Sequence, residues 1–119
     1  MPQYMLLIYG PAEGGPSPEE LEAQTPRWFE YTEALSEAGA LVAGEALEAA
    51  ADARTVRVRS GARQITDGPV AEAGDVLGGY YVIDVPDWSA AEEWAARIPS
   101  APYGAVEIRP ILVFAEAAA

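Results

Sequence analysis

Apolar and polar residues alternate along this chain in blocks that predict a mixed α+β fold. The run Tyr4–Tyr9 is wholly apolar, as expected of a strand covered on both faces. Thr55–Arg59 alternates valine with arginine, the period of a strand with one apolar face, and Arg63–Thr66 is placed to pair back on it through the Ser60-Gly61 turn. Further strands are predicted at Ala40–Leu47, Gly79–Val85 and Val106–Phe114.

Two segments between these strands carry helix signals. Ser17 precedes Pro18 and Glu20, which gives an N-cap, a proline at the first helical position and a capping box. Apolar residues then recur at helical spacing until Gly39, a predicted stop. Pro26 interrupts this pattern, so the helix either kinks or restarts with Thr25 as its cap, and we favour the restart.

The second helix is predicted between Ser89, which forms a capping box with Glu92, and Pro99. The resulting order, β-α-β-hairpin-β-α-β, predicts one α+β domain over residues 1–119. We expect a ferredoxin-like antiparallel sheet with two helices on one face and an added hairpin. The other sheet face would expose apolar residues, so a homodimer packed through the sheet is expected.

Composition narrows the chemistry of this domain. The net charge of −12, with only seven basic residues, argues against general nucleic-acid binding. No apolar run is long enough to cross a membrane, and the N-terminus does not look like a signal peptide. The chain has no cysteine, which fits a cytoplasmic protein.

The absence of histidine is the sharper constraint on catalysis. Without histidine or cysteine, catalytic triads and histidine–zinc sites are excluded. No pattern in the sequence indicates another metal or a cofactor, so none is expected. Any acid–base catalyst must therefore be a carboxylate or a tyrosine in a special environment.

The most distinctive segment is Asp67–Tyr81, which joins an Asp-Gly-Pro turn, a loop of about ten residues and a Gly-Gly step into an aromatic strand. The motif Asp67-Gly68-Pro69-Val70 resembles the signature of the YCII-related family, in particular its DGPF branch, which has Phe where this chain has Val70. Other segments are similar to the family in the same order: YMLLIY, LVAGEAL, LGGYYVIDV, AEEWAARIP and VEIRP.

This resemblance implies a dimeric α+β barrel-like domain with a pocket between sheet and helices. Better-studied relatives use a His–Asp pair for elimination or isomerisation of substrates derived from aromatic rings. This sequence lacks the histidine, and Asp67 is the candidate for the aspartate's place.

Four residues are candidates for the site. Asp67 is either a proton acceptor or hydrogen-bond anchor, or an Asx cap of its own turn. Glu45 lies in an apolar strand, where it could pair with Arg109 as a brace. Arg109 also suits a carboxylate ligand, because its planar fork matches one bidentately. Tyr80 and Tyr81 should point to opposite faces, one into the pocket and one toward the dimer sheet.

Aromatic side chains are also available for a cavity between helix and sheet, namely Trp28, Phe29 and Trp94, although core packing is the more common role for such residues. The leading hypothesis is a domain that binds a small organic ligand. Two alternatives stay open: a histidine-free isomerase or lyase that uses Asp67, and a regulatory domain linked, through the family alone, to sigma-factor-associated transcription.

Overall fold

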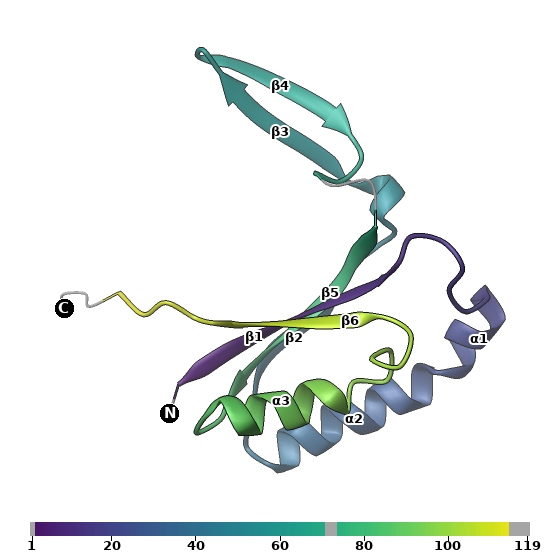
Figure 1. The fold of residues 1–119 in the computed structure, drawn as a ribbon, viewed down its shortest axis with the longest axis vertical. Helices are drawn as coiled ribbons and strands as arrows, with labels where there is room; N and C mark the ends of the chain where they lie inside the picture. The colour runs from purple at the N-terminus through teal and green to yellow at the C-terminus, as the bar shows by residue number, and fades with distance from the viewer. Residues whose placement is uncertain (1, 71–73, 115–119) are drawn as a thin grey trace.

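A four-stranded antiparallel sheet forms the centre of the molecule. The computed structural model describes residues 2–70 and 74–114. The strands follow the order β2-β5-β1-β6 across the sheet, and every neighbouring pair is antiparallel. Their bounds are β1 Gln3–Pro11, β2 Leu41–Ala46, β5 Asp75–Asp84 and β6 Ala105–Pro110. This order, with helices between β1 and β2 and between β5 and β6, confirms the ferredoxin-like α+β fold (Figure 1).

The helix after β1 is split, as predicted. It consists of α1 Pro18–Ala23 and α2 Thr25–Glu37. Ser17 and Glu20 form the capping box, with Glu20 N–H donating to Ser17 Oγ at 3.1 Å and Ser17 N–H donating to Glu20 Oε1 at 2.8 Å. The cap of α2 is Gln24 rather than Thr25, which places Pro26 in the first turn, where a missing amide costs nothing.

The second predicted helix is α3, Trp88–Ala96, and its cap also lies earlier than expected. Asp87, not Ser89, is the N-cap, and its carboxylate accepts a hydrogen bond from Ala90 N–H at 2.9 Å. Asp and Ser are both good N-cap residues. Asp87 takes the role because it has an extended backbone and directly precedes the first turn.

The hydrophobic core lies between one face of the sheet and the helices. Strand β1 contributes alternate residues to it, and the end of β5 contributes Ile83, followed by Val85 just beyond the strand. The buried cluster consists of Tyr4, Leu6, Ile8, Tyr31, Leu35, Ala40, Ile83, Val85, Ala91, Ala95 and Ile98. Because α2 and α3 both supply members, the two helices cover the same face of the sheet.

The opposite, open face of the sheet carries the other half of each strand's alternation. Cross-strand partners share a face, so Leu7, Tyr80 and Glu45 form one row across β1, β5 and β2. A neighbouring row contains Met5 and Val82. The centre of this face is apolar, because Met5, Leu7 and Val82 lie there. No described helix covers it.

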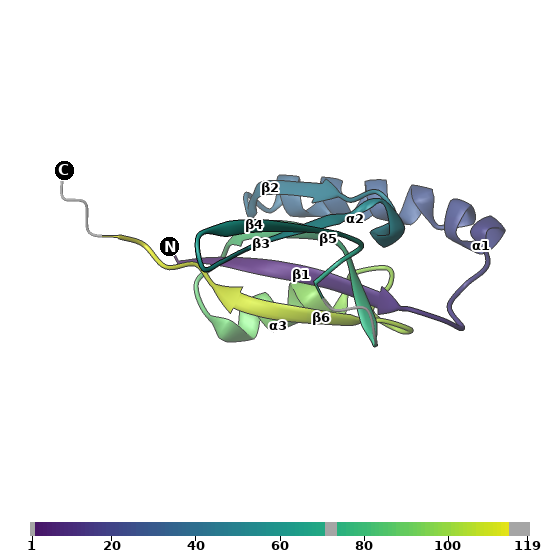
Figure 2. The ribbon, with the colours of Figure 1, turned by 90° about the horizontal axis from the view of Figure 1, so that it is seen from above.

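A hairpin projects beyond the end of this sheet (Figure 1) and lies in front of it when the molecule is seen from above (Figure 2). A short 3₁₀ turn, η1 Ala50–Asp52, leads into β3 Arg54–Arg59, which pairs with β4 Ala62–Asp67 in a separate two-stranded sheet. Ser60 and Gly61 at the tip both have positive φ, 52° and 78°, as a tight primed hairpin turn requires.

Several strand ends differ from the predicted ones. Strand β5 begins at Asp75 instead of Gly79, because Leu77 and Val76 pair with the end of β1 past a bulge. The loop after the Asp-Gly-Pro turn is thus shorter than predicted, spanning 68–74, of which residues 71–73 lie outside the described part. Strand β6 ends at Pro110 rather than Phe114, and one further hydrogen bond, from Ile111 N–H to the Gln3 carbonyl at 2.9 Å, reaches the first residue of β1.

Candidate functional site

A cleft of about 860 Å³ opens between the sheet and the first helices. Its floor is the helix-facing side of β1, β2 and β5, and one wall is formed by α1 and α2. The loop from Pro11 to Pro16, rich in glycine and proline, forms another border. Leu21, Trp28, Phe29, Leu41 and Ile8 make the lining predominantly apolar.

Tyr81 anchors the inner end of this cleft. Its hydroxyl and that of Thr32 on α2 lie 2.6 Å apart in a hydrogen bond. Its ring packs edge-on against Tyr31, with centroids 5.3 Å apart, and Tyr31 donates to the carbonyl of Trp94 at 2.8 Å. These contacts tie β5, α2 and α3 together, so the inner wall is held in a fixed geometry.

Tyr31 itself stays a neutral phenol in this network. Burial raises the pKa of its hydroxyl well above the usual value, and the neighbouring Tyr81 adds to the effect, while Arg97 opposes it. The hydroxyl of Tyr31 thus acts as a structural donor and offers no acid or base near neutral pH.

Glycines make room for the aromatic floor. A Cβ at Gly44 would lie 2.6 Å from Cδ1 of Tyr81, so the ring of Tyr81 packs directly over bare backbone. A Cβ at Gly79 would lie 2.9 Å from the carbonyl oxygen of Glu45. The Gly-Glu and Gly-Gly steps of the sequence therefore shape the cleft through close packing of strands and rings.

The charged groups in the lining of the cleft are all negative. Glu13 and Glu45 are the charged residues among the described residues of its lining, and no arginine is among them. Ser100, on the segment after α3, also lines the cleft and is 7% exposed. Its buried Oγ has no hydrogen-bond partner within residues 2–70 and 74–114. A buried hydroxyl of this kind is a point for a water molecule or a ligand group to bind.

Two of the predicted site residues, Glu45 and Tyr80, border the cleft. They are direct cross-strand partners whose side chains belong to the open face of the sheet, so they are part of the lining where β2 borders the cleft and not of its helix-facing floor. The neighbouring tyrosines do point to opposite faces, Tyr81 to the helix side and Tyr80 to the other, although both are in the lining, and contact of Tyr80 with a dimer sheet stays a prediction. Trp28 and Phe29 also line the cleft as proposed, whereas Trp94 packs against Tyr31 and under the Arg97 guanidinium.

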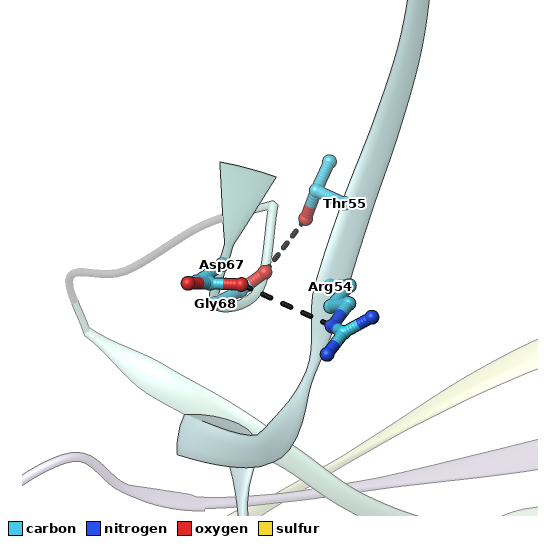
Figure 3. Close-up of polar contacts among 4 residues, drawn as sticks. All are labelled: Arg54, Thr55, Asp67 and Gly68. Carbon is cyan, nitrogen blue, oxygen red and sulfur yellow. Dashed lines mark hydrogen bonds and ion pairs between the residues drawn. The ribbon is translucent and has the colours of Figure 1, made fainter. Parts of the chain in front are cut away.

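Asp67 lies outside the cleft, at the base of the hairpin. Its side chain is 94% exposed, and Oδ1 lies 3.9 Å from Nε of Arg54, its cross-strand partner (Figure 3). The turn that follows is held by other groups: Gly68 N–H donates to the carbonyl of Ala53 at 2.7 Å, and Thr55 Oγ1 donates to the carbonyl of Gly68 at 2.8 Å. The motif thus closes the base of the hairpin. Asp67 is not among the residues that line the cleft, and a catalytic role for it stays a prediction.

Arg109 is likewise outside the cleft. It lies on β6, at one edge of the sheet, while Glu45 lies on β2 at the other edge, with two strands between them. Three strand spacings of about 4.8 Å separate the two backbones, so the expected Glu45–Arg109 brace is wrong. Arg109 Nη1 instead donates to Oε2 of Glu107 at 3.1 Å, and both side chains are substantially exposed.

Sequence reasoning missed three contributors to the site. The cleft lining also includes Thr32, Ser100 and Tyr103. The hydroxyl of Tyr103 donates a hydrogen bond to Oε1 of Gln24, which is distant in sequence, at 2.8 Å. The signal available for Thr32 was its place on the inward stripe of the helix. Ser100 and Tyr103 lie in a short irregular segment whose position depends on the packing of α3, which no local pattern reveals.

The described residues contain no group of three or more acidic, cysteine or histidine side chains placed to hold a metal ion. Within the same part of the chain, no helix has the length and apolar character needed to span a membrane.

Comparison with known proteins gives one family. The model of the YCII-related domain matches residues 2–115, nearly the whole chain. No curated protein matches the sequence.

Proposed function

Because the chain belongs to the YCII-related domain family and carries an apolar cleft beside its sheet, we propose that it binds a small organic ligand in that cleft. The observation that carries this proposal is the cleft itself. Its volume of about 860 Å³ lies in the range of small-molecule sites, and its lining combines apolar and aromatic side chains with a few hydroxyl and carboxylate groups.

The position of Phe29 supports this function further. Phe29 lines the cleft from α2, yet 71% of it is exposed, so its ring contributes little to the core. An aromatic ring held at the mouth of an apolar cleft is well placed to stack on a bound molecule. Its removal should affect binding more than folding.

Replacement of Phe29 tests this directly. A panel of neutral, acidic and basic aromatic compounds is screened by thermal shift, and hits are measured by calorimetry. Phe29→Ala should weaken binding of a hit about fivefold, since an aromatic contact contributes roughly 1 kcal/mol. Phe114→Ala is the matched control, because Phe114 is 79% exposed, against 71% for Phe29, and lies outside the cleft. A panel without any binder would contradict the proposed function.

The homodimer is proposed as the functional assembly. Met5, Leu7 and Val82 form the apolar centre of the open sheet face, and sheet faces of this kind are normally covered. A second copy packed on the same face would give a two-fold, self-complementary interface. The exposed apolar residues Leu112, Val113 and Phe114 just beyond β6 would extend it.

Mass measurement in solution tests the dimer. The protein should sediment as a dimer at micromolar concentration, and Leu7→Glu should dissociate it, because the charge would be buried without a partner. Leu21→Glu, on the helix side, serves as the control and should leave the mass unchanged. A monomeric wild-type mass would contradict this assembly.

The finer assignments are part of the same proposal. Asp67-Gly68-Pro69 supports a place in the DGPF branch, with Val70 in the position of the phenylalanine. Val70 is exposed, so the exchange alters no described core contact. A cytoplasmic location accords with the absence of cysteine.

A further inference from the structure

The charge of the cleft defines which ligands it accepts. This inference rests on the proposed function, since it names the class of molecule that the cleft binds. Every arginine of the described chain lies outside the lining, whereas Glu13 and Glu45 belong to it. We propose that the cleft binds a neutral or protonated amine carried on an apolar or aromatic group, and that it rejects organic acids.

Desolvation makes the rejection of acids strong. A carboxylate entering an apolar cleft loses its hydration and needs a cation or several donors in exchange. Arg109 was the candidate for that cation, but it lies on the far edge strand and is paired with Glu107. The protein's net charge of −12 repels an anion further as it approaches.

An ammonium group finds the opposite situation. Glu45, on the β2 edge, and Glu13, in the loop after β1, are both exposed at the cleft and can accept its hydrogen bonds. The faces of Trp28 and Phe29 offer cation–π contacts in the same space. The apolar part of the ligand is then left to Leu21, Leu41 and the aromatic floor.

Ser100 provides an independent sign that a polar ligand group belongs here. Its Oγ is buried at the cleft without a partner among the described residues, although a buried hydroxyl normally makes at least one hydrogen bond. A hydroxyl both donates and accepts, so Ser100 fits an alcohol, an amide or an amine equally. The two glutamates, not Ser100, set the preference for positive charge.

A matched series of compounds tests the inference. 1-Naphthylmethylamine, 1-naphthylmethanol and 1-naphthoate share one ring system and differ in charge. Calorimetry at pH 7 and fixed ionic strength should rank the amine tightest and the carboxylate weakest, with about a tenfold difference, because two exposed carboxylates contribute roughly 0.5–1 kcal/mol each.

Charge variants locate the effect. Glu13→Gln combined with Glu45→Gln should weaken binding of the amine and remove most of its preference over the alcohol. Glu37→Gln combined with Glu93→Gln changes the net charge equally on exposed helix positions outside the cleft, and it should keep the preference. Glu45→Arg should raise the affinity for the carboxylate.

The outcomes separate the two proposals. Tight binding of 1-naphthoate to the wild type, equal to or above that of the amine, would overturn the ligand class and leave the binding function standing. Equal loss of preference in both double variants would also overturn it, because the field of the whole chain would then explain the selectivity. Failure of all three compounds and of the wider panel would remove the binding function itself.

Discussion

Gly44 shows how a single missing side chain shapes the cleft. The ring of Tyr81 occupies the place where a Cβ would stand, and the same ring bonds through its hydroxyl to Thr32. Any larger residue at position 44 must therefore move Tyr81 away from α2. A separation of 2.6 Å is much shorter than an ordinary van der Waals contact, and the Tyr80 carbonyl oxygen would lie only 3.1 Å from the same Cβ.

Gly44→Ala should accordingly destabilise the protein by about 1–3 kcal/mol in urea unfolding, the usual effect of overpacking. It should also weaken binding of a cleft ligand, because the inner wall shifts with Tyr81. Gly10→Ala is the control, since a Cβ there meets nothing within 4 Å although Gly10 lines the same cleft. Equal stability of the two variants would contradict the packing described for Tyr81.

Tyr31 makes a prediction about alkaline pH. Its pKa is raised in the folded protein, mainly by burial, above its ordinary value near 10. The unfolded chain therefore loses this proton first, and the stabilisation present below about pH 10 is lost as the pH rises beyond it. Tyr31→Phe should flatten the fall in unfolding free energy above about pH 10, measured by urea denaturation.

The same variant carries its own control at neutral pH. Loss of the hydrogen bond to the Trp94 carbonyl should cost about 1 kcal/mol there. Tyr103→Phe removes a partly buried hydroxyl that donates to Gln24 outside this network and should leave the alkaline slope unchanged. A slope in Tyr31→Phe as steep as in the wild type would show that Tyr31 does not govern alkaline unfolding.

At the scale of elements, the β3–β4 hairpin depends on the clamp at its base. An isolated two-stranded ribbon is marginal in water, and Val56, Val58 and Ile65 on one of its faces are more than half exposed. Thr55, which is 8% exposed, supplies the hydroxyl that holds the Gly68 carbonyl. The fold of the hairpin is thus secured locally, at the point where it joins the sheet.

Thr55→Val keeps the shape of this side chain and removes its donor. Amide hydrogen exchange within 54–67 should become faster, by about fivefold for the loss of roughly 1 kcal/mol, while the amides of β1 and β5 keep their protection. Thr66→Val is the matched control, because Thr66 is the cross-strand partner of Thr55 but is exposed. Uniformly faster exchange over the whole chain would contradict a local role.

The sequence predicted the elements better than their meeting points. Local signals such as the Ser17 capping box, the break at Pro26 and the alternation of Thr55–Arg59 act within a few residues, and each is present in the structure. The position of Asp67 depends instead on where a whole hairpin points. Its motif suggested a pocket residue, whereas the hairpin carries it away from the cleft.

Strand order was the second long-range unknown. Glu45 and Arg109 each lie in the predicted strands, but their separation follows from the placement of β2 and β6 at opposite edges. That placement results from the packing of two crossover helices on one face, which no single segment encodes. Trp28 was predictable, because helical periodicity alone brings it to the inward side, whereas the buried position of Tyr31 was not predicted.

The whole molecule is flat and open rather than rounded. Its extents are 49 × 45 × 19 Å, and its radius of gyration of 16.5 Å exceeds the value of about 13.5 Å typical of a compact domain of this length. The hairpin and the segment after β6 extend away from the sheet and account for the difference (Figure 1). Both carry exposed apolar side chains, which accords with the proposed homodimer.

The strand order also determines what a cut in the hairpin would do. Four of the seven arginines lie there, exposed or partly exposed, so trypsin should cleave the hairpin first. The amino-terminal piece would hold β1 and β2, and the carboxyl-terminal piece β5 and β6. In the order β2-β5-β1-β6 strands of the two pieces alternate, so every neighbouring pair joins one piece to the other. The nicked protein should therefore run as two bands on a denaturing gel yet keep its native mass, and the two pieces expressed separately should reassemble as a split protein.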